Sequence, residues 1–442
     1  MTRWQRLAWF AAVAAPPALT LALIAVHGVN VPQWDQWAMP SLFKAFDLGT
    51  LDFADFWAQR NEHRPVVPQA IDFGLAQLTA WDIRVELFFD FAVALVTFAL
   101  LVVLLRRTLD RDGFVIASVV SSVVFFSPMQ WENWMWGWQL EWFLSNLAAL
   151  GAFWALVHLV DRARLRGLAV AALCGVVATF SLGQGLLVWP IGLVLLVLRG
   201  RPWRLWALLS VATIGAYFAD YDNTGTASKT AFVEHPLEFV KYVCLYVGRP
   251  FGFDNATGAL AGALLLATFA LTAAYVLAHR RDEELRARTH VWLAVGLYVV
   301  GAALITAVSR VTFGAAQAAS SRYNGMGALL AIATLALLFA LARSGVFRRQ
   351  VRDEAASRRV PVLARRRAMV LLALPLLVVA VVNTGEGIGQ MEREGDELRA
   401  AQRCLRSVET VLDPCFDDPQ SGVRQQQFEG LVYLRSKGWA GF

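Results

Sequence analysis

Long uninterrupted runs of apolar residues constrain this chain more than any other feature. A membrane-crossing helix needs about 20 consecutive, mostly apolar residues, and Leu7–Val29, Leu87–Leu105 and Ala259–Ala278 reach this length. Shorter apolar runs end in Trp, Tyr, Gly or Ser, as interfacial segments often do. We expect eleven spans: Leu7–Val29, Leu87–Leu105, Phe114–Ser127, Leu140–Val160, Leu168–Leu182, Leu186–Leu198, Leu205–Ala219, Ala259–Ala278, Val291–Val308, Met326–Ala342 and Ala368–Val382. The sequence therefore predicts an all-α, polytopic membrane protein.

The positive charges indicate the orientation of these spans. With the N-terminus placed inside, the short inner loops hold 24 of the 40 Lys and Arg residues, nine of them between Arg343 and Arg367. This is the positive-inside bias. The net charge of +6 is therefore explained by topology signals and contacts with membrane lipids, and no nucleic-acid partner is expected. Because eleven crossings follow a cytoplasmic N-terminus, the C-terminus is expected outside.

Most of the chain outside the predicted spans lies on the outer face. We expect a transmembrane domain over residues 1–382, with outer segments 30–86, 128–139, 220–258 and 309–325, followed by an outer tail over residues 383–442. Within the first segment, apolar residues between Trp37 and Phe46 recur at helical spacing, which predicts an amphipathic helix in the outer interface. In the tail, Cys404 and Cys415 could close a small disulfide loop in an oxidising compartment. Any chemistry is expected on this face.

Asp35 is the first candidate for that chemistry. It sits in Trp34-Asp35-Gln36-Trp37, about six residues after the first predicted span. Aromatic neighbours at the membrane surface would raise the pKa of its carboxyl group. Such a carboxylate is suited to accept a proton from a hydroxyl, although a plain surface Asp in an aromatic belt is the alternative.

The same segment contains Glu62-His63-Arg64, followed by Pro65. An acid, an imidazole and a fixed cation in consecutive positions can converge from an irregular loop. Arg64 could hold a phosphate oxygen or pair with Glu62. A solvated polar loop is the alternative.

A tryptophan-rich run forms the third candidate, with five Trp between Trp131 and Trp142. An interfacial belt explains one or two of them. The others, interleaved with Glu132 and Gln139, suggest apolar platforms beside hydrogen-bonding groups, as a sugar ring requires. On one helix, Glu132, Trp136 and Gln139 would share a face.

Two arginines flank the ninth and tenth predicted spans on the outside. Arg310 follows the ninth span and Ser321-Arg322-Tyr323 precedes the tenth. Arginine at a membrane edge is costly unless it is paired, and a lipid phosphate is a natural partner. Snorkelling at a helix end is the alternative. Asp90, about one turn inside the second span, is a candidate partner for Arg84 or Arg322.

Many spans, a long first outer segment and the early Asp35 together resemble the GT-C superfamily of membrane glycosyltransferases. Glu62-His63-Arg64 and Ser321-Arg322-Tyr323 give looser support. The resemblance implies transfer of a sugar from a polyprenyl-phosphate donor, with inversion, in a bacterial inner membrane. It assigns the catalytic base to Asp35 alone. The paired Asp-Glu of protein O-mannosyltransferases is lacking here, so the expected acceptor is a glycan or a lipid-linked saccharide.

Two other function classes stay open on sequence grounds. A glycan polymerase or ligase, for instance of O-antigen, would use a large late outer loop, for which residues 220–258 are a modest candidate. A lipid-linked-saccharide transporter would need charges near the membrane midplane, which are rare here. No resident cofactor is expected. A divalent metal at Asp220-Tyr221-Asp222 is the alternative left open.

Overall fold

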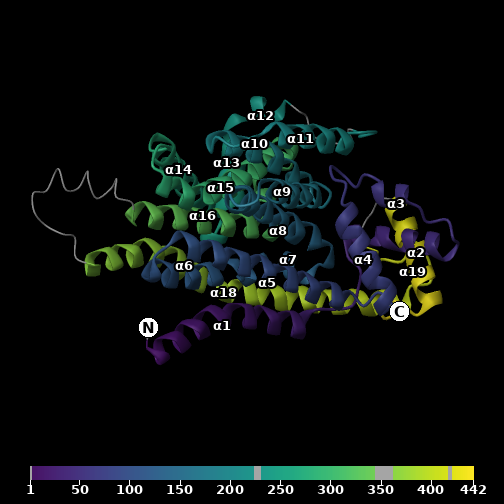
Figure 1. Ribbon diagram of the computed structural model, residues 1–442. Helices are drawn as coiled ribbons and strands as arrows, with labels where there is room; N and C mark the ends of the chain where they lie inside the picture. The colour runs from purple at the N-terminus through teal and green to yellow at the C-terminus, as the bar shows by residue number, and fades with distance from the viewer. Residues whose placement is uncertain (1, 223–229, 344–361, 417–420) are drawn as a thin grey trace, which may run out of the picture.

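The structure is a computed structural model that describes residues 2–222, 230–343, 362–416 and 421–442 (Figure 1). Within these ranges the secondary structure is helical, and no strand occurs beyond one isolated bridge between Arg60 and His63. Eight segments are long and apolar enough to cross a bilayer. They are built on α1 (Arg3–His27), α5 (Ile83–Thr108), α6 (Arg111–Phe125), α8 (Leu140–Trp154), α14 (Asn255–Ala278), α15 (Glu283–Arg310), α16 (Asn324–Arg343) and α18 (Val362–Ser407).

Shorter helices complete the bundle. They are α9 (Arg164–Thr179), α10 (Val188–Leu198), α11 (Arg204–Tyr217) and α13 (Pro236–Gly248). Each of the eleven predicted spans thus coincides with a helix, which confirms the all-α polytopic class. Helices α9, α10 and α11 are shorter than a full bilayer crossing requires. Helix α13 lies inside the predicted outer segment 220–258 and packs against α14.

Aspartates at the helix starts explain how short turns separate such apolar helices. Asp82, Asp110, Asp254 and Asp282 each accept a hydrogen bond from a backbone N–H in the first turn of the helix that follows. These caps satisfy N–H groups that would otherwise lack a partner. The chain can therefore restart a helix within a few residues of the previous one.

The burial of the helices indicates which of them face lipid. In α16, 78% of the apolar window is buried inside the protein, whereas in α1 the share is 17%. Helix α14 likewise exposes Leu264 and Leu271. Large apolar side chains exposed around a bundle are a liability in water but are satisfied in a bilayer.

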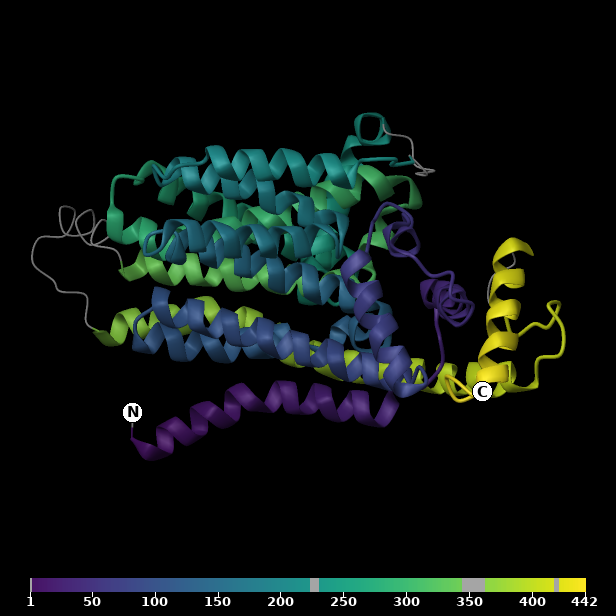
Figure 2. The ribbon, with the colours of Figure 1, turned by 45° about the vertical axis from the view of Figure 1, so that its right-hand side comes forward.

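Non-spanning helices gather at one end of the bundle, where α1 ends at His27 and α5 begins at Ile83; we call this the site end. They are α2 (Met39–Asp47), α3 (Phe53–Trp57), α4 (Val66–Thr79) and α19 (Ser421–Lys437). Figures 1 and 2 show them grouped with the C-terminus, while the N-terminus lies at the opposite end. Most of the predicted basic loop, residues 344–361, lies outside the described residues.

The predicted interfacial helix exists as α2, but its apolar face packs on protein. Phe43 is fully buried, and its ring lies 5.1 Å from that of Trp81 and 5.3 Å from that of Trp439. α4 and the C-terminal residues cover part of that face, while Phe46 stays 50% exposed.

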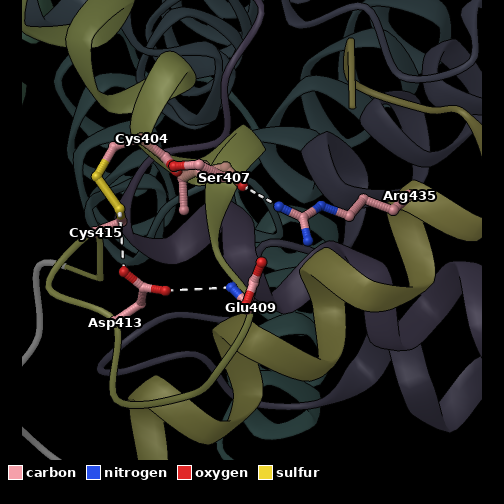
Figure 3. Close-up of a disulfide and its surroundings, with 7 residues drawn as sticks. Cys404, Ser407, Glu409, Asp413, Cys415 and Arg435 are labelled. Atoms are coloured by element: carbon pink, nitrogen blue, oxygen red, sulfur yellow. Dashed lines mark hydrogen bonds between the residues drawn. A yellow bond between two sulfur atoms is a disulfide. The ribbon is translucent and has the colours of Figure 1, made fainter.

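The last predicted span and the first part of the tail form one helix, α18, which continues to Ser407. A disulfide joins Cys404, in the last turn of α18, to Cys415 beyond its end (Figure 3). Arg435 of α19 donates a hydrogen bond to the carbonyl oxygen of Val408 at 2.6 Å. These links hold α19 against the end of α18.

The disulfide can be tested by counting thiols. In protein purified without reductant and then denatured, we expect maleimide to label two cysteines, Cys174 and Cys244, which are free, and four after reduction. In Cys415→Ser the loss of the cross-link should destabilise the tail by about 3 kcal/mol, seen as faster tryptic cleavage there. Cys174→Ser is the matched control, and labelling of four thiols without reduction would contradict the bond.

Candidate functional site

A cavity of about 970 Å³ opens at the site end of the bundle; we call it the main cavity. Its walls come from segments far apart in sequence, including the residues after α1, the loop before α4, the start of α8 and the end of α15. Eight of the ten predicted site residues line it: Asp35, Glu62, His63, Glu132, Gln139, Arg310, Arg322 and Tyr323. The sequence-derived candidates therefore converge on one chamber.

Asp35 lies on η1, a short 3-10 helix spanning Trp34–Ala38. The residues around it fix this turn. Gln33 donates from Nε2 to the carbonyl oxygen of Met135 at 2.9 Å, and Gln36 donates from Nε2 to Glu86 Oε2 at 2.7 Å. One link reaches the tryptophan-rich run and the other reaches the start of α5, so the backbone of Asp35 is held from two sides.

Glu86 connects this turn to the core. Its second oxygen, Oε1, accepts a hydrogen bond from Trp81 Nε1 at 2.7 Å, while Oε2 binds Gln36. The Glu86 side chain is 2% exposed, and a buried carboxyl group needs such partners. Glu86 thus ties η1 to the start of α5.

The Asp35 carboxyl group faces the cavity, where it is open to solvent but surrounded by protein on most sides. Desolvation raises its pKa, while the positive charges of Arg322, Arg310 and Arg60 act in the opposite direction. It makes no hydrogen bond or ion pair with any described residue. Its oxygens are therefore available to an incoming hydroxyl.

The backbone beside Asp35 is strained. Trp34 adopts a φ of 41°, a left-handed conformation that a bulky residue rarely takes. Its ring meets that of Trp136 edge to face, with 4.7 Å between centroids. Strain of this kind is held in place by surrounding contacts and is common at functional sites.

Arg310 and Glu62 form the first ion pair of the cavity, with Nη2 and Oε2 3.1 Å apart. Arg310 ends α15, and Glu62 belongs to the loop before α4. Both side chains are half-buried. A single contact leaves further N–H groups of the guanidinium able to bind a ligand.

Arg322 and Glu132 form the second, longer pair, at 3.8 Å between Nη1 and Oε1. Glu132 Oε2 accepts from Ser321 Oγ at 2.8 Å and from the backbone N–H of Arg322 at 2.9 Å. Glu132 therefore binds the backbone before α16 more closely than it binds the Arg322 guanidinium. The Arg322 guanidinium also lies over the Tyr323 ring, 5.5 Å from its centroid.

His63 lines the cavity as a neutral imidazole. Burial lowers its pKa to about 4, with Arg310 acting in the same direction and Glu62 opposing it. Nδ1 accepts a hydrogen bond from the backbone N–H of Gly183 at 3.3 Å, which puts the ring proton on Nε2. At neutral pH His63 can donate a hydrogen bond but adds no charge.

Arg64 has a different position from the one expected. It is 3% exposed and donates to the carbonyl oxygens of Trp57, Tyr217 and Ala219 at 2.8, 2.9 and 2.5 Å. It lines a smaller pocket rather than the main cavity. Its guanidinium fastens the Glu62 loop to the end of α11 and does not pair with Glu62.

The tryptophan-rich run lines the cavity through Trp136, Trp138 and Trp142, but Trp131 does not. The run is not one helix, because α7 (Trp131–Met135) ends at Met135 and a separate 3-10 turn begins at Gly137. Glu132, Trp136 and Gln139 nevertheless reach the same chamber. Gln139 is fully buried, and neither of its amide atoms has a partner among the described residues.

One wall of the cavity is apolar. Leu304 and Ile305 of α15 both line it, and they are 40% and 47% exposed. The chamber therefore combines charged groups with an apolar wall on one of the apolar helices of the bundle.

Some residues of the cavity escaped sequence analysis. Arg60 precedes the predicted Glu62 motif, and its Nε has no partner in the described chain. Tyr217 and Tyr221 also line the cavity, and both donate to the carbonyl oxygen of Glu62, at 3.0 and 3.2 Å. Arg60 lies two residues before Glu62, and this position could have been used to predict it as a site residue. Tyr217 ends an apolar helix, a position that does not by itself indicate a site.

The predicted partners of Asp90 were wrong. Arg84 pairs with Asp82 at 2.6 Å and Arg322 with Glu132. Both Asp90 oxygens are buried without a partner among the described residues.

These observations define a polytopic, all-α membrane protein with a charged cavity at one end of its bundle. No family model matches the chain, and no curated protein matches it in sequence. It is similar in structure to ArnT from Cupriavidus metallidurans bound to undecaprenyl phosphate, at 12% identity and a TM-score of 0.49, over 99% of this chain and 88% of that chain.

The close approach at Gly137 gives a test of how η1 is held. A Cβ atom there would overlap the Glu86 carboxylate and lie 3.0 Å from Gln36 Nε2. We expect Gly137→Ala to destabilise the protein by about 1–3 kcal/mol, measured by thermal unfolding in detergent. Gly74→Ala on α4, where no atom lies within 4 Å, is the control and should be neutral or slightly stabilising. If both variants unfold at the temperature of the wild type, the close contact of Gly137 with Glu86 and Gln36 does not contribute to stability.

Proposed function

We propose that this protein is a glycosyltransferase that moves a sugar from a polyprenyl-phosphate donor to a hydroxyl of a glycan or lipid-linked acceptor. The observation that carries the proposal is the content of the main cavity. An unpartnered carboxylate, Asp35, shares the chamber with Arg60, Arg310 and Arg322, and one wall of the chamber is apolar. These are the groups that activation of a hydroxyl and departure of a lipid phosphate require.

Arg310 and Arg322 suit the phosphate of the donor. Each is paired through one contact to a glutamate, which offsets the cost of holding the cation at a membrane edge and leaves other N–H groups free to bind. A phosphate on a long isoprenoid would reach them past Leu304 and Ile305, with its chain in the bilayer. Donors arranged around a phosphate stabilise the negative charge that grows as it leaves.

Asp35 would act as the general base. Its carboxylate takes the proton of the acceptor hydroxyl while the hydroxyl oxygen attacks the anomeric carbon. The bond from that carbon to the phosphate oxygen breaks, and polyprenyl phosphate leaves with the electron pair. A single displacement of this kind inverts the anomeric configuration. The raised pKa of Asp35 makes it a stronger base than a solvated carboxylate.

The site end is proposed to face the extracytoplasmic side of a bacterial inner membrane. Two independent features support this orientation. Basic residues are concentrated in the alternate loops expected inside, and the disulfide at Cys404 and Cys415 belongs to an oxidising compartment. The N-terminus is then cytoplasmic and the C-terminus extracytoplasmic.

Asp35→Asn tests the assigned base. The substitution keeps the size of the side chain and removes the proton acceptor, so transfer from undecaprenyl-phosphate-linked sugars should fall about 100-fold to 10,000-fold. Asp112→Asn, in the first turn of α6 at the opposite end of the bundle, is the matched control. Wild-type turnover by a folded Asp35→Asn variant would rule out this role.

The pH dependence gives a second test. Because the pKa of Asp35 is raised above 3.8, the acidic limb of kcat/KM should lie above the value of an ordinary Asp. Positive charge lowers this pKa, so Arg60→Gln should raise it and move the limb to higher pH. Arg84→Gln, paired with Asp82 outside the cavity, should leave it in place. A limb that stays or moves downward in Arg60→Gln would contradict the assignment.

A further inference from the structure

Three helices of the bundle meet at the end opposite the main cavity; we call this the far end. Helices α8 and α10 begin beside the cavity, because Glu141 of α8 and Gln184, just before α10, both line it. Helix α15 runs in the other direction, since its last residue, Arg310, lines the cavity and Glu283 begins the helix. The three helices pack against one another (Figure 1). The ends of α8 and α10 and the start of α15 therefore lie together at the far end.

Charged and imidazole side chains gather where these helices meet. We define the far-end cluster as Asp161, Arg199, Arg201, Arg286 and His290. The charges of Arg201 and Arg286 act on Arg199, and the charges of Arg199 and Arg286 act on His290. Three guanidinium groups and an imidazole thus lie close enough to interact, with the Asp161 carboxylate among them.

Asp161 offsets only part of this positive charge. Its Oδ2 lies 2.6 Å from Arg199 Nη2, and its Oδ1 lies 2.9 Å from Arg201 Nε, so one carboxylate is shared by two arginines. Arg286 pairs with Glu283 at 3.4 Å, but the Glu283 side chain is 89% exposed, and exposed pairs contribute little. The cluster keeps an excess of positive charge even when Glu283 is counted.

The cluster also lacks acceptor oxygens. Three of its nitrogen atoms have no hydrogen-bond partner among the described residues, namely Nε of Arg199, Nε of Arg286 and Nδ1 of His290. The Arg199 side chain is 10% exposed and His290 is 2% exposed. A guanidinium N–H can only donate, and a buried donor without an acceptor costs free energy. Acceptor oxygens at this place would therefore be stabilising.

The backbone beside the cluster departs from an α-helix. The turn η4 (Ala155–Leu159) is π-helical, and the N–H of Val160 donates to the carbonyl oxygen of Ala155 at 3.0 Å. Arg199 donates from Nη2 to the carbonyl oxygen of Val157 in this turn, also at 3.0 Å. Turns of this kind are rare and frequently occur at functional sites. The guanidinium of Arg199 is thereby fixed between η4 and Asp161.

Apolar surface lies next to the cluster. Val194 and Val197, in the last two turns of α10, are exposed, and so is Trp203, two residues after Arg201. Apolar side chains exposed on a membrane bundle are accommodated by lipid tails, and Trp is favoured at the level of the head groups. The chains of a lipid bound at the cluster would therefore find an apolar surface beside it.

We propose that the far-end cluster binds the phosphate group of an anionic membrane lipid. A phosphate supplies acceptor oxygens for Arg199, Arg286 and His290, and its negative charge offsets the excess positive charge. Basic pockets between membrane helices bind lipid head groups in this way. The cluster lies at the opposite end of the bundle from the main cavity, so this proposal does not rest on the proposed function.

The test measures lipid binding by the full-length protein in detergent, with no sugar donor present. The midpoint of thermal unfolding is followed as each probe is added, because a ligand that binds the folded protein raises the midpoint. The probes are dioleoylphosphatidylglycerol, dioleoylphosphatidylcholine and inorganic phosphate. We expect phosphatidylglycerol to stabilise the protein at lower concentration than either of the other two.

Two variants locate the binding. Arg201→Gln and Arg286→Gln each remove one charge from a partly exposed side chain, so both should fold, and each should weaken phosphatidylglycerol binding about fivefold, as expected for one arginine near a membrane surface. Arg3→Gln on α1 is the matched control. It removes the same charge at the same end of the bundle but outside the cluster, and it should bind the lipid as the wild type does.

Unchanged binding of phosphatidylglycerol in both cluster variants would overturn the proposal. Equal stabilisation by phosphatidylcholine would also overturn it, as would a loss in Arg3→Gln as large as in the cluster variants, because binding would then follow overall charge. If inorganic phosphate stabilises as strongly as phosphatidylglycerol, the cluster binds a free anion and the assignment to a lipid is wrong. Undiminished transfer in Asp35→Asn would contradict the proposed function and leave these results unaffected.

Discussion

The organising constraint of this structure is the cost of placing charge at the edge of a low-dielectric bundle. Arg310 and Arg322 end or precede long apolar helices, and each is matched by a glutamate from another segment. Such pairs bring distant parts of the chain together, because an unpaired charge at this position would cost free energy of folding. The loop with Glu62 and the turn with Glu132 are thereby drawn to the same chamber, whose shape follows from this pairing.

How far the sequence predicts this arrangement differs between its elements. Apolar run length located every long helix, because length and composition are local properties. The continuation of α18 to Ser407 and the helix α13 within an expected loop depend on tertiary contacts, so run length could not reveal them. The burial of α2 depends in the same way on its packing against Trp439, which lies almost 400 residues away in the sequence.

The site residues also divide into those that local sequence could identify and those that depend on tertiary contacts. Asp35, Glu62 and Arg322 could be selected because charged groups beside membrane segments are unusual. Arg64 shares those properties, yet it binds backbone carbonyls, since the curve of the chain at Tyr217 and Ala219 presents two acceptors to it and Trp57 presents a third. Sequence spacing distinguishes a ligand-binding arginine from a structural one only when the surrounding backbone is known.

Helix α18 has a consequence for the end of the bundle that holds the main cavity. It is a single helix of 46 residues, which corresponds to about 70 Å at 1.5 Å per residue. The same helix both lies in the bundle and carries Glu394 beyond its apolar part. The position of Glu394 relative to the bundle therefore depends on the tilt and the bending of this one helix. Pro375, within the apolar part of the helix, is the position where a backbone hydrogen bond is missing and bending costs least.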